Sequence, residues 1–437
     1  MRKGTFGVLT ALLCVTLLFA AVPAAAQQTV RLTFWTFVDA HADYYLARAE
    51  EFNAQNPGVR LELEVVSMPY REMHDQLLIS LQTGIGAPDI VDIEITPFAR
   101  FLREPIQLLQ LDRIIEPHRP YIIQNRLTPY SKDGHVYGVP THLGAFVTFY
   151  NREFFNDRGI DIESIELWDD FVAVGAKATR DVNNDGVVDE WMTMLDGAGW
   201  FQWFGMIQQQ GSGHFDAEGN PILNSEVNIR TLEYLHDMVY KHRIALAGIG
   251  LHDLQAYDMI NAGQVGAVWM PQWYSIRYTE FMPDLHGKMV MRPLPAWTPG
   301  GSRSAMGGGT GTAITSHINP AHVDIAMRFL EFAKLTYDAN IKIWTEFGFD
   351  PFRHDVFDDP QLQRPIPYFS NEVVFNVIKD IADEINPQYL SPVFQETNWE
   401  VLDPEVFFPV ITENSISPRD ALNAAQERVL DLLRNLI

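Results

Sequence analysis

Cysteine is almost absent from the chain. The single cysteine, Cys14, lies close to the N-terminus, so the rest of the chain can form no disulfide, no cysteine metal site and no cysteine nucleophile. A lipoprotein signal needs a small residue directly before its cysteine. Leu13 stands there instead, so we expect no lipid anchor. A chain without other thiols suits an oxidising compartment outside the cytoplasm.

Long apolar runs are absent after the first residues. Arg2 and Lys3 precede an apolar run over residues 8–19, and the small residues 24–26 follow it. The run is shorter than the roughly 20 residues that span a bilayer. This order predicts a signal peptide over residues 1–26, cleaved at its end, rather than a transmembrane anchor. We therefore expect a periplasmic protein.

Positive charge is scarce. The chain has 56 acidic and 32 basic residues, which gives a formal net charge of −24, and two of the basic residues belong to the expected signal peptide. A field of this sign repels phosphate backbones and anionic lipid surfaces. We therefore expect no nucleic-acid partner and no binding to a membrane surface.

Several catalytic signatures are missing as well. The chain has no HExxH pair, no GxSxG elbow and no Walker A lysine after its glycine-rich segment 307–311. These absences argue against a zinc protease, an α/β-hydrolase and a P-loop nucleotidase.

The segment after residue 26 alternates between strand and helix patterns. Residues 29–35, 59–66 and 89–95 have the alternation or β-branched content of strands, while residues 44–53 and 70–82 have helical spacing. The order β-α-β-α-β predicts a mostly parallel sheet with right-handed crossovers, and hence an α/β fold.

The ends of these strands matter for function, because open α/β sheets bind ligands beyond the carboxyl ends of their strands. Trp35 and Thr36 close the first expected strand, and Glu94 lies at the end of the third. We expect all three to face one crevice.

Later segments continue the α/β pattern. We expect strands over 146–150 and 265–270, a helix over 168–178, and two amphipathic helices over 321–337 and 419–436.

Read together, the segments carry a family resemblance. The matching pieces, in chain order, are FWT at 34–36, FNAQNPG at 52–58, GIGAPDIV at 84–91, YGVP at 137–140, FYNREF at 149–154, WDDF at 168–171, GQVGAVW at 263–269 and AMRFL at 326–330. This set resembles the extracellular solute-binding proteins of bacterial ATP-driven sugar importers, the family that includes maltose-binding protein. Each piece is weak alone, but their order and spacing over the chain are specific.

The resemblance implies a periplasmic-binding-protein type II fold, with two α/β lobes joined by a hinge of three chain crossings and a ligand cleft between them. By analogy, the first lobe comprises residues 27–140 plus 289–337, and the second comprises 141–288 plus 338–437. It also implies a monomer that is not an enzyme, binds a carbohydrate, needs no cofactor and has the permease subunits of an ABC importer as partners.

The aromatic residues fit a carbohydrate ligand, because sugars present apolar ring faces and a rim of hydroxyls. The chain has 10 tryptophans, all after the expected signal peptide, and two aromatic blocks at 200–204 and 269–274. Large aromatics also fill cores, so each tryptophan has a core interpretation beside the binding one. The expected ligand-binding residues are Trp35, Thr36, Glu94, His142, Asp196, Trp200, Trp203, Trp269, Trp273, Tyr274, Gly308, Arg353 and Trp399.

Two of the polar candidates have alternatives. Asp92 and Glu94 lie two apart on a strand and so share a face, as the paired carboxylates of a secreted glycoside hydrolase could. That enzyme remains an alternative function, together with a binding protein for a non-sugar solute such as a peptide or a glycerol phosphodiester. Arg353 either donates into the cleft or forms a salt bridge.

A possible calcium loop lies at 181–189, where oxygen-bearing side chains recur at every second residue. Gly186 permits the sharp turn, but Met192 stands where an EF-hand has its bidentate glutamate. The segment is therefore either a structural calcium site or an Asx-rich turn without metal. The expected ligands are Asp181, Asn183, Asp185, Val187 and Asp189.

Overall fold

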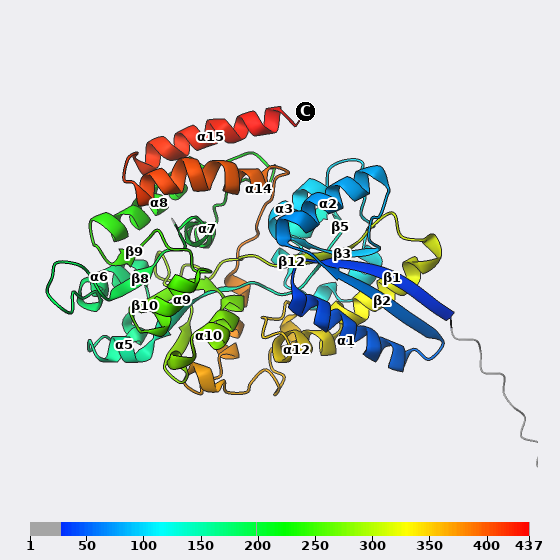
Figure 1. Ribbon diagram of the computed structural model, residues 1–437, viewed down its shortest axis with the longest axis horizontal. Helices are drawn as coiled ribbons and strands as arrows, with labels where there is room; N and C mark the ends of the chain where they lie inside the picture. Colours follow the sequence, from blue (N-terminus) through cyan, green and yellow to red (C-terminus); the bar gives the residue numbers. More distant parts are fainter. Residues whose placement is uncertain (1–27, 198, 437) are drawn as a thin grey trace, which may run out of the picture.

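The computed structural model describes residues 28–197 and 199–436, so the predicted signal peptide and Cys14 lie outside the described residues. Two five-stranded sheets form the centres of two lobes, which lie side by side in Figure 1. The architecture confirms the expected α/β fold with two lobes. Among the described residues, no helix has both the length and the apolar character needed to cross a bilayer.

The first lobe contains a mixed sheet with the strand order β2-β1-β3-β12-β6. β1 runs parallel to β2 and β3, whereas β12 runs antiparallel to β3 and β6. The strands are β1 (Gln28–Thr36), β2 (Val59–Ser67), β3 (Ile90–Glu94), β6 (Val139–Pro140) and β12 (Thr310–Ile314), with a separate hairpin of β4 (Ser131–Lys132) and β5 (His135–Val136). The helices are α1 (Asp39–Gln55), α2 (Tyr70–Thr83), α3 (Ile95–Phe101), α4 (Asp112–Ile115), α11 (Val323–Leu330) and α12 (Tyr337–Thr345).

The second lobe has the strand order β11-β7-β10-β8-β9. β7 lies antiparallel between β11 and β10, and β8 lies parallel between β10 and β9. The strands are β7 (Phe146–Asn151), β8 (Trp191–Met194), β9 (Ala245–Leu246), β10 (Val265–Pro271) and β11 (Met289–Arg292). Its helices include α5 (Arg152–Asn156), α6 (Trp168–Ala178), α7 (Trp200–Gln209), α8 (Glu226–Tyr240), α9 (Leu254–Asn261), α10 (Ser275–Phe281), α14 (Phe394–Glu396) and α15 (Pro418–Arg434), and α13 (Phe375–Ile381) lies in the long return segment.

The alternation along β1 explains how its side chains divide. Leu32 and Phe34 are at most 1% exposed, and the Phe34 ring lies 4.4 Å from the ring of Tyr45 on α1. Because successive strand residues point to opposite faces, Trp35 faces away from α1. Trp35 is only partly buried, as is the rest of that face near its end.

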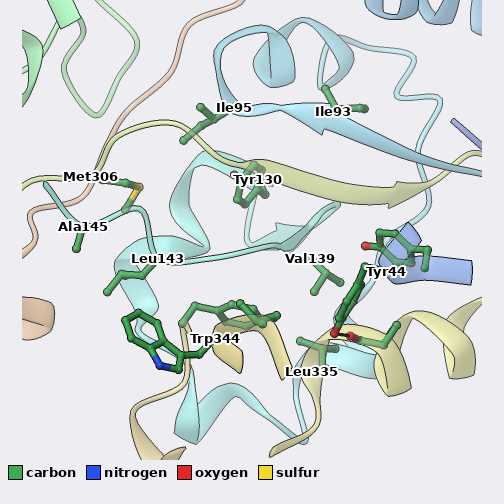
Figure 2. Packing of buried hydrophobic residues seen from close by; sticks show 14 of the residues in the cluster. Tyr44, Ile93, Ile95, Tyr130, Val139, Leu143, Ala145, Met306, Leu335 and Trp344 are labelled. Carbon is green, nitrogen blue, oxygen red and sulfur yellow. Dashed lines mark hydrogen bonds between the residues drawn. The ribbon is translucent and has the colours of Figure 1, made fainter. Parts of the chain in front are cut away.

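The described chain passes between the lobes at three places, which meet at one hinge. The first crossing joins β6 to β7, and the second joins β11 to β12. They touch where Gly307 N donates to Gly144 O at 2.8 Å and where Ala145 pairs with Met306; Figure 2 shows Ala145 and Met306 next to each other. On the segment that follows α12 and leads to the third crossing, the carboxylate of Asp350 accepts hydrogen bonds from Gly144 N at 3.1 Å and Ala145 N at 2.7 Å.

The glycines of the second crossing reflect this crowding. A Cβ on Gly307 would lie 2.3 Å from the Phe146 ring, and one on Gly309 would lie 2.0 Å from Nη2 of Arg126. Gly309 also has a φ of +105°, which L side chains rarely adopt. The glycine-rich segment is therefore a product of close backbone approach at the hinge.

Both expected lobe boundaries after residue 288 are wrong. β11 pairs with β7, so residues 289–292 belong to the second lobe and the chain returns to the first only along the second crossing. α12 packs on the first lobe instead of starting the second, because Lys342 forms an ion pair with Glu51 of α1 at 2.6 Å. Strand pairing and these helix contacts, which the local pattern does not reveal, decide the boundaries.

Candidate functional site

Glu94 presents a fixed carboxylate on the side of the first lobe that faces the second. It ends β3 and caps α3, because its Oε2 accepts a hydrogen bond from Thr96 N at 2.7 Å. The hydroxyl of Tyr70, at the start of α2, donates to the same oxygen at 3.1 Å. Burial raises the pKa of Glu94, while the hydrogen bonds from Thr96 and Tyr70 oppose this shift. Within the described residues, the hydrogen bonds from Thr96 N and from the Tyr70 hydroxyl both fall on Oε2.

His74, which the sequence pattern did not single out, positions Glu94 and Tyr70. Its Nε2 accepts a hydrogen bond from Glu94 N at 3.1 Å, and its Nδ1 donates to Tyr70 O at 2.7 Å. These two bonds require the neutral tautomer with its proton on Nδ1. Burial lowers the pKa of His74 to about 4, so the ring stays neutral at physiological pH. The end of β3 is therefore held against α2.

The second lobe contributes two carboxylates. Asp196 follows β8, and its Oδ1 accepts a hydrogen bond from Leu251 N at 2.7 Å. Burial raises the pKa of Asp196. Burial also raises the pKa of Asp403 to about 6, and the negative charge of Asp196 adds to that shift. No sequence pattern singled out Asp403, which lies in the π-helical segment Thr397–Thr412.

Partly buried aromatic rings lie beside these carboxylates and the hinge. The indole nitrogen of Trp273 donates to Gly307 O at 2.9 Å, and the ring of His252 stacks on Trp273 with a centroid distance of 5.9 Å and an angle of 14°. Phe201 lies 6.4 Å from Trp273 and 5.3 Å from Trp200. Trp200 and Trp273 thus belong to one aromatic group next to the second crossing.

Trp399 contacts the opposite lobe. It lies in the π-helical segment Thr397–Thr412, which follows α14, and its ring meets the ring of Tyr70 at 5.6 Å. The Arg71 guanidinium lies 4.3 Å from the centroid of the same indole. We group Trp35, Glu94, Asp196, Trp200, Trp273, Trp399 and Asp403 as candidates for ligand contact and call this set the inter-lobe site.

Three expected aromatic ligands belong instead to the core of the second lobe. Trp203, Trp269 and Tyr274 are each 0% exposed. The Trp203 indole nitrogen donates to Asn228 O at 3.0 Å, and the ring of Trp269 packs against Trp168 at 5.1 Å. β10 is buried on both faces, α7 turns Trp203 inward, and the buried hydroxyl of Tyr274 donates to Leu251 O, so these three side chains pack inside the protein.

Two expected polar ligands are also engaged elsewhere. Thr36 is 0% exposed, and its hydroxyl donates to Asp92 at 3.3 Å. Arg353 forms a two-pronged ion pair with Asp355, at 3.0 and 2.6 Å, and also donates to Leu335 O. The salt-bridge interpretation of Arg353 is therefore correct, and both residues stabilise the first lobe.

Asp92 lies in a buried polar network rather than in a carboxylate pair with Glu94. It accepts hydrogen bonds from His41 at 2.8 Å and from Thr312 at 2.5 Å, and Lys334 donates to Thr312 at 2.8 Å. Burial alone would raise the pKa of Asp92, but the hydrogen bond from His41 and the charge of Lys334 bring it below its usual value. Burial lowers the pKa of Lys334 to about 7.

His142 and Gly308 lie at the hinge. His142 is 4% exposed, its ring lies 4.8 Å from Phe349, and burial lowers its pKa well below the usual value. The carbonyl oxygen of Gly308 accepts a hydrogen bond from Arg126 at 3.0 Å. A Cβ on Gly308 would lie 3.2 Å from the indole nitrogen of Trp273, so this position places the hinge backbone directly against the aromatic group.

The expected calcium loop has the hydrogen bonds of an Asx-rich turn. Asp181 accepts from Gly186 N, Asn183 from Asp185 N, and Asp189 from Val182 N, each at 2.8 Å. Over residues 28–197 and 199–436, no three His, Cys, Asp or Glu side chains are grouped so that they could hold a metal ion. The backbone amides account for the conformation of the loop, and calcium binding there stays a prediction.

The family identity follows from comparison with known proteins. The family described as bacterial extracellular solute-binding protein matches residues 39–336. The chain belongs to this family. An arabinooligosaccharide-binding protein of Halalkalibacterium halodurans is 40% identical over 92% of this chain and 89% of its own. A protein of the same name from Bacillus subtilis is 38% identical over 97% of this chain and 98% of its own.

Solved structures of other solute-binding proteins share the fold. The sugar-binding protein MalE of Xanthomonas citri has a TM-score of 0.77 at 16% identity, covering 93% of this chain and 98% of its own. An ABC substrate-binding protein of Listeria monocytogenes, in complex with cycloalternan, has a TM-score of 0.72 at 18% identity, covering 93% and 99%. At such low identities the likeness concerns the fold, which is the expected type II fold of periplasmic binding proteins.

Proposed function

We propose that the chain captures an oligosaccharide between its lobes outside the cytoplasm and delivers it to an ABC importer. The observation that carries the proposal is the inter-lobe site itself, in which carboxylates from both lobes lie near partly buried indoles. Carboxylates accept hydrogen bonds from sugar hydroxyls, and indoles cover the apolar faces of sugar rings. The names of the two relatives with about 40% identity make arabino-oligosaccharides the first substrates to test.

Each lobe has its own part in capture. Glu94 is held by Thr96, Tyr70 and His74, so its carboxylate is already oriented before a ligand arrives. Pre-oriented acceptors lose less entropy on binding. Asp196 and Trp200 come from the opposite lobe, so a ligand that touches both lobes binds the closed form better than the open form. Such a ligand shifts the open–closed equilibrium toward closure.

The importer's permease subunits are the proposed partners, and a periplasmic monomer is the proposed form. Delivery to a permease needs a carrier that reports its loaded state, and closure about the hinge changes the outer surface of both lobes together. The acidic chain, with its net charge of −24, suits a freely diffusing carrier that avoids anionic lipid.

A binding role fits the site better than glycoside hydrolysis. Asp92, the expected partner of Glu94 in a carboxylate pair, is 0% exposed and accepts hydrogen bonds from His41, Thr36 and Thr312. An acid or nucleophile must reach the glycosidic bond, and Asp92 cannot do so from inside this network.

Calorimetric titration with purified arabino-oligosaccharides tests the proposal. We expect saturable binding by the protein without its signal peptide, and recovery of the sugar unchanged when the complex is unfolded and analysed by chromatography. Trp273→Ala should weaken binding by about tenfold or more, because it removes a ring from the site. Trp297→Ala is the matched control, since this indole packs on Tyr234 within the second lobe. Cleaved sugar, or no binding of any oligosaccharide, would contradict the proposal.

A further inference from the structure

Away from the hinge, the lobes touch where α3 meets α14. Nη1 of Arg100 in α3 donates to Oε1 of Gln395 in α14 at 3.0 Å, and Nε of Arg100 lies 3.7 Å from Glu396. Figure 1 shows α14 as the element of the second lobe that reaches α3. The contact therefore joins segments that are 295 positions apart in the chain.

Trp399 extends this contact toward the strand ends. Its ring meets Tyr70 at 5.6 Å with an interplanar angle of 60°, and Arg71 covers it at 4.3 Å. An arginine at this distance from an indole is attracted to its π-face. Tyr70 also packs against Phe37, which follows β1, at 5.2 Å. Trp399, Tyr70 and Arg71 thus lie at the edge of the region beyond the carboxyl ends of β1 and β3.

The contacts of Tyr70 and Trp399 extend toward carboxylates of both lobes. On the first lobe, the hydroxyl of Tyr70 donates to Glu94 at 3.1 Å. On the second lobe, Asp403 follows Trp399 in the same helical segment, and its carboxyl senses the charge of Asp196. Tyr70 thus joins Glu94 to Trp399 through direct contacts, and Asp403 lies four residues after Trp399 in the same helical segment.

We propose that Trp399, Tyr70 and Arg71 form an end wall of the inter-lobe site, so that the protein binds a terminal ring of its oligosaccharide and not an internal stretch. This inference rests on the proposed function. A sugar chain that continued past the wall would have to separate Trp399 from Tyr70 and break the bond between Arg100 and Gln395. Because the wall is built from both lobes, it closes behind the terminal ring only when the lobes close.

Titrations with end-modified ligands test the wall. One arabino-oligosaccharide ladder carries a bulky aminobenzamide group at the reducing end, a second carries a branching arabinose on the non-reducing terminal ring, and a third is unmodified. We expect at least one modified ladder to bind the wild-type protein about tenfold or more weakly than the unmodified ladder, since the added group meets the wall.

Substitutions then assign the loss to the wall. Trp399→Ala should recover the binding of the excluded ladder relative to the unmodified one, and Arg71→Ala should do so in part. Trp297→Ala, which removes an indole of the same lobe away from α2, should recover nothing. Recovery confined to the wall variants supports end-on recognition, whichever terminus is the excluded one.

Other outcomes overturn the inference. Equal binding of all three ladders by the wild-type protein would mean that the site is open at this edge. A uniform loss for every ligand in Trp399→Ala, without recovery of the excluded ladder, would mean that Trp399 only holds the lobes together. Failure of the unmodified ladder to bind the wild-type protein is a separate result, and it would contradict the proposed function itself.

Discussion

The two lobes treat their buried polar groups differently. In the first lobe, Asp92 and Lys334 are joined through Thr312 in a network with His41, and the carboxylate of Asp92 is stabilised there. In the second lobe, burial raises the pKa of both Asp196 and Asp403. The network around Asp92 thus fixes the architecture of the first lobe. Asp196 and Asp403 form no ion pair among the described residues and, like Glu94 of the first lobe, have carboxyl groups whose pKa burial raises.

The largest expected effect comes from breaking the network of the first lobe. Asp92→Asn keeps the shape of the side chain but removes the charge that faces Lys334, so we expect a loss of about 3–5 kcal/mol in the free energy of unfolding at neutral pH. Urea unfolding monitored by fluorescence measures it. Asp431→Asn, which breaks the exposed pair with Arg434, should change stability by less than about 1 kcal/mol. Similar stabilities for both variants would contradict the assigned role of the network.

Two tryptophans of α7, Trp203 and Trp200, differ in their expected roles: the first belongs to the core of the second lobe and the second to the inter-lobe site. Trp203→Ala should lower the free energy of unfolding by about 3–5 kcal/mol, because Trp203 is 0% exposed. Trp200→Ala should cost no more than about 1 kcal/mol in stability but weaken sugar binding by about tenfold. Denaturant titration and calorimetry on the folded variants measure the two effects. A loss of affinity confined to Trp203→Ala would reverse the assignment.

The carboxylates of the second lobe should make binding depend on pH. Asp403 has a pKa of about 6, so we expect affinity to fall about tenfold for each pH unit below that value as the acceptor becomes protonated. Stability should respond in the opposite direction. The folded pKa lies above the unfolded one, so the contribution of Asp403 to stability is full below the unfolded pKa and is lost as the pH rises through about 6.

Sugar affinity and the free energy of unfolding, each measured at several pH values on both sides of 6, test the two predicted directions. In Asp403→Asn, both quantities should depend less on pH. An affinity that is the same on both sides of pH 6 would exclude Asp403 from the site.

The smallest expected effect concerns the loop of the second lobe at residues 181–189. If calcium binds there as predicted, millimolar CaCl₂ should raise the melting temperature by about 2 °C over a chelated sample, because the ion binds the folded state. Asp181→Asn should abolish the difference. An unchanged melting temperature would leave the backbone amides as the full account of the turn.

Local patterns predicted the first half of the fold well. The expected strand over 59–66 is β2 (Val59–Ser67), and the expected helix over 70–82 is α2 (Tyr70–Thr83). Such elements are set by side-chain periodicity within one segment. The expected single helix over 321–337 instead divides into α11, a π-helical turn at Glu331–Leu335 and the start of α12. That turn contains Lys334, whose buried contacts with Thr141 and Thr312 come from distant segments.

The site was predictable in composition but not in detail. Glu94, Trp200 and Trp273 were singled out by strand ends and aromatic blocks. Glu94 ends β3 of the first lobe, and Trp200 and Trp273 belong to the aromatic group of the second lobe, so their role as ligand contacts stays a prediction. Trp203 belongs to the same aromatic block, yet Phe407 covers it at a ring distance of 5.3 Å. The sequence of one segment cannot reveal which of its faces a segment two hundred residues later will cover. Asp403 was missed for the same reason.

The hinge has a consequence for the direction of lobe movement. Asp350 accepts hydrogen bonds from two consecutive amides of the first crossing, Gly144 and Ala145, and Gly144 O in turn accepts one from Gly307 N of the second crossing. Linked backbone segments of this kind permit rotation but resist translation, so the lobes should open by rotation about the hinge. A Cβ at position 144 would lie 2.8 Å from Gly307 O. Even alanine there would push the first and second crossings apart and so change the resting angle between the lobes.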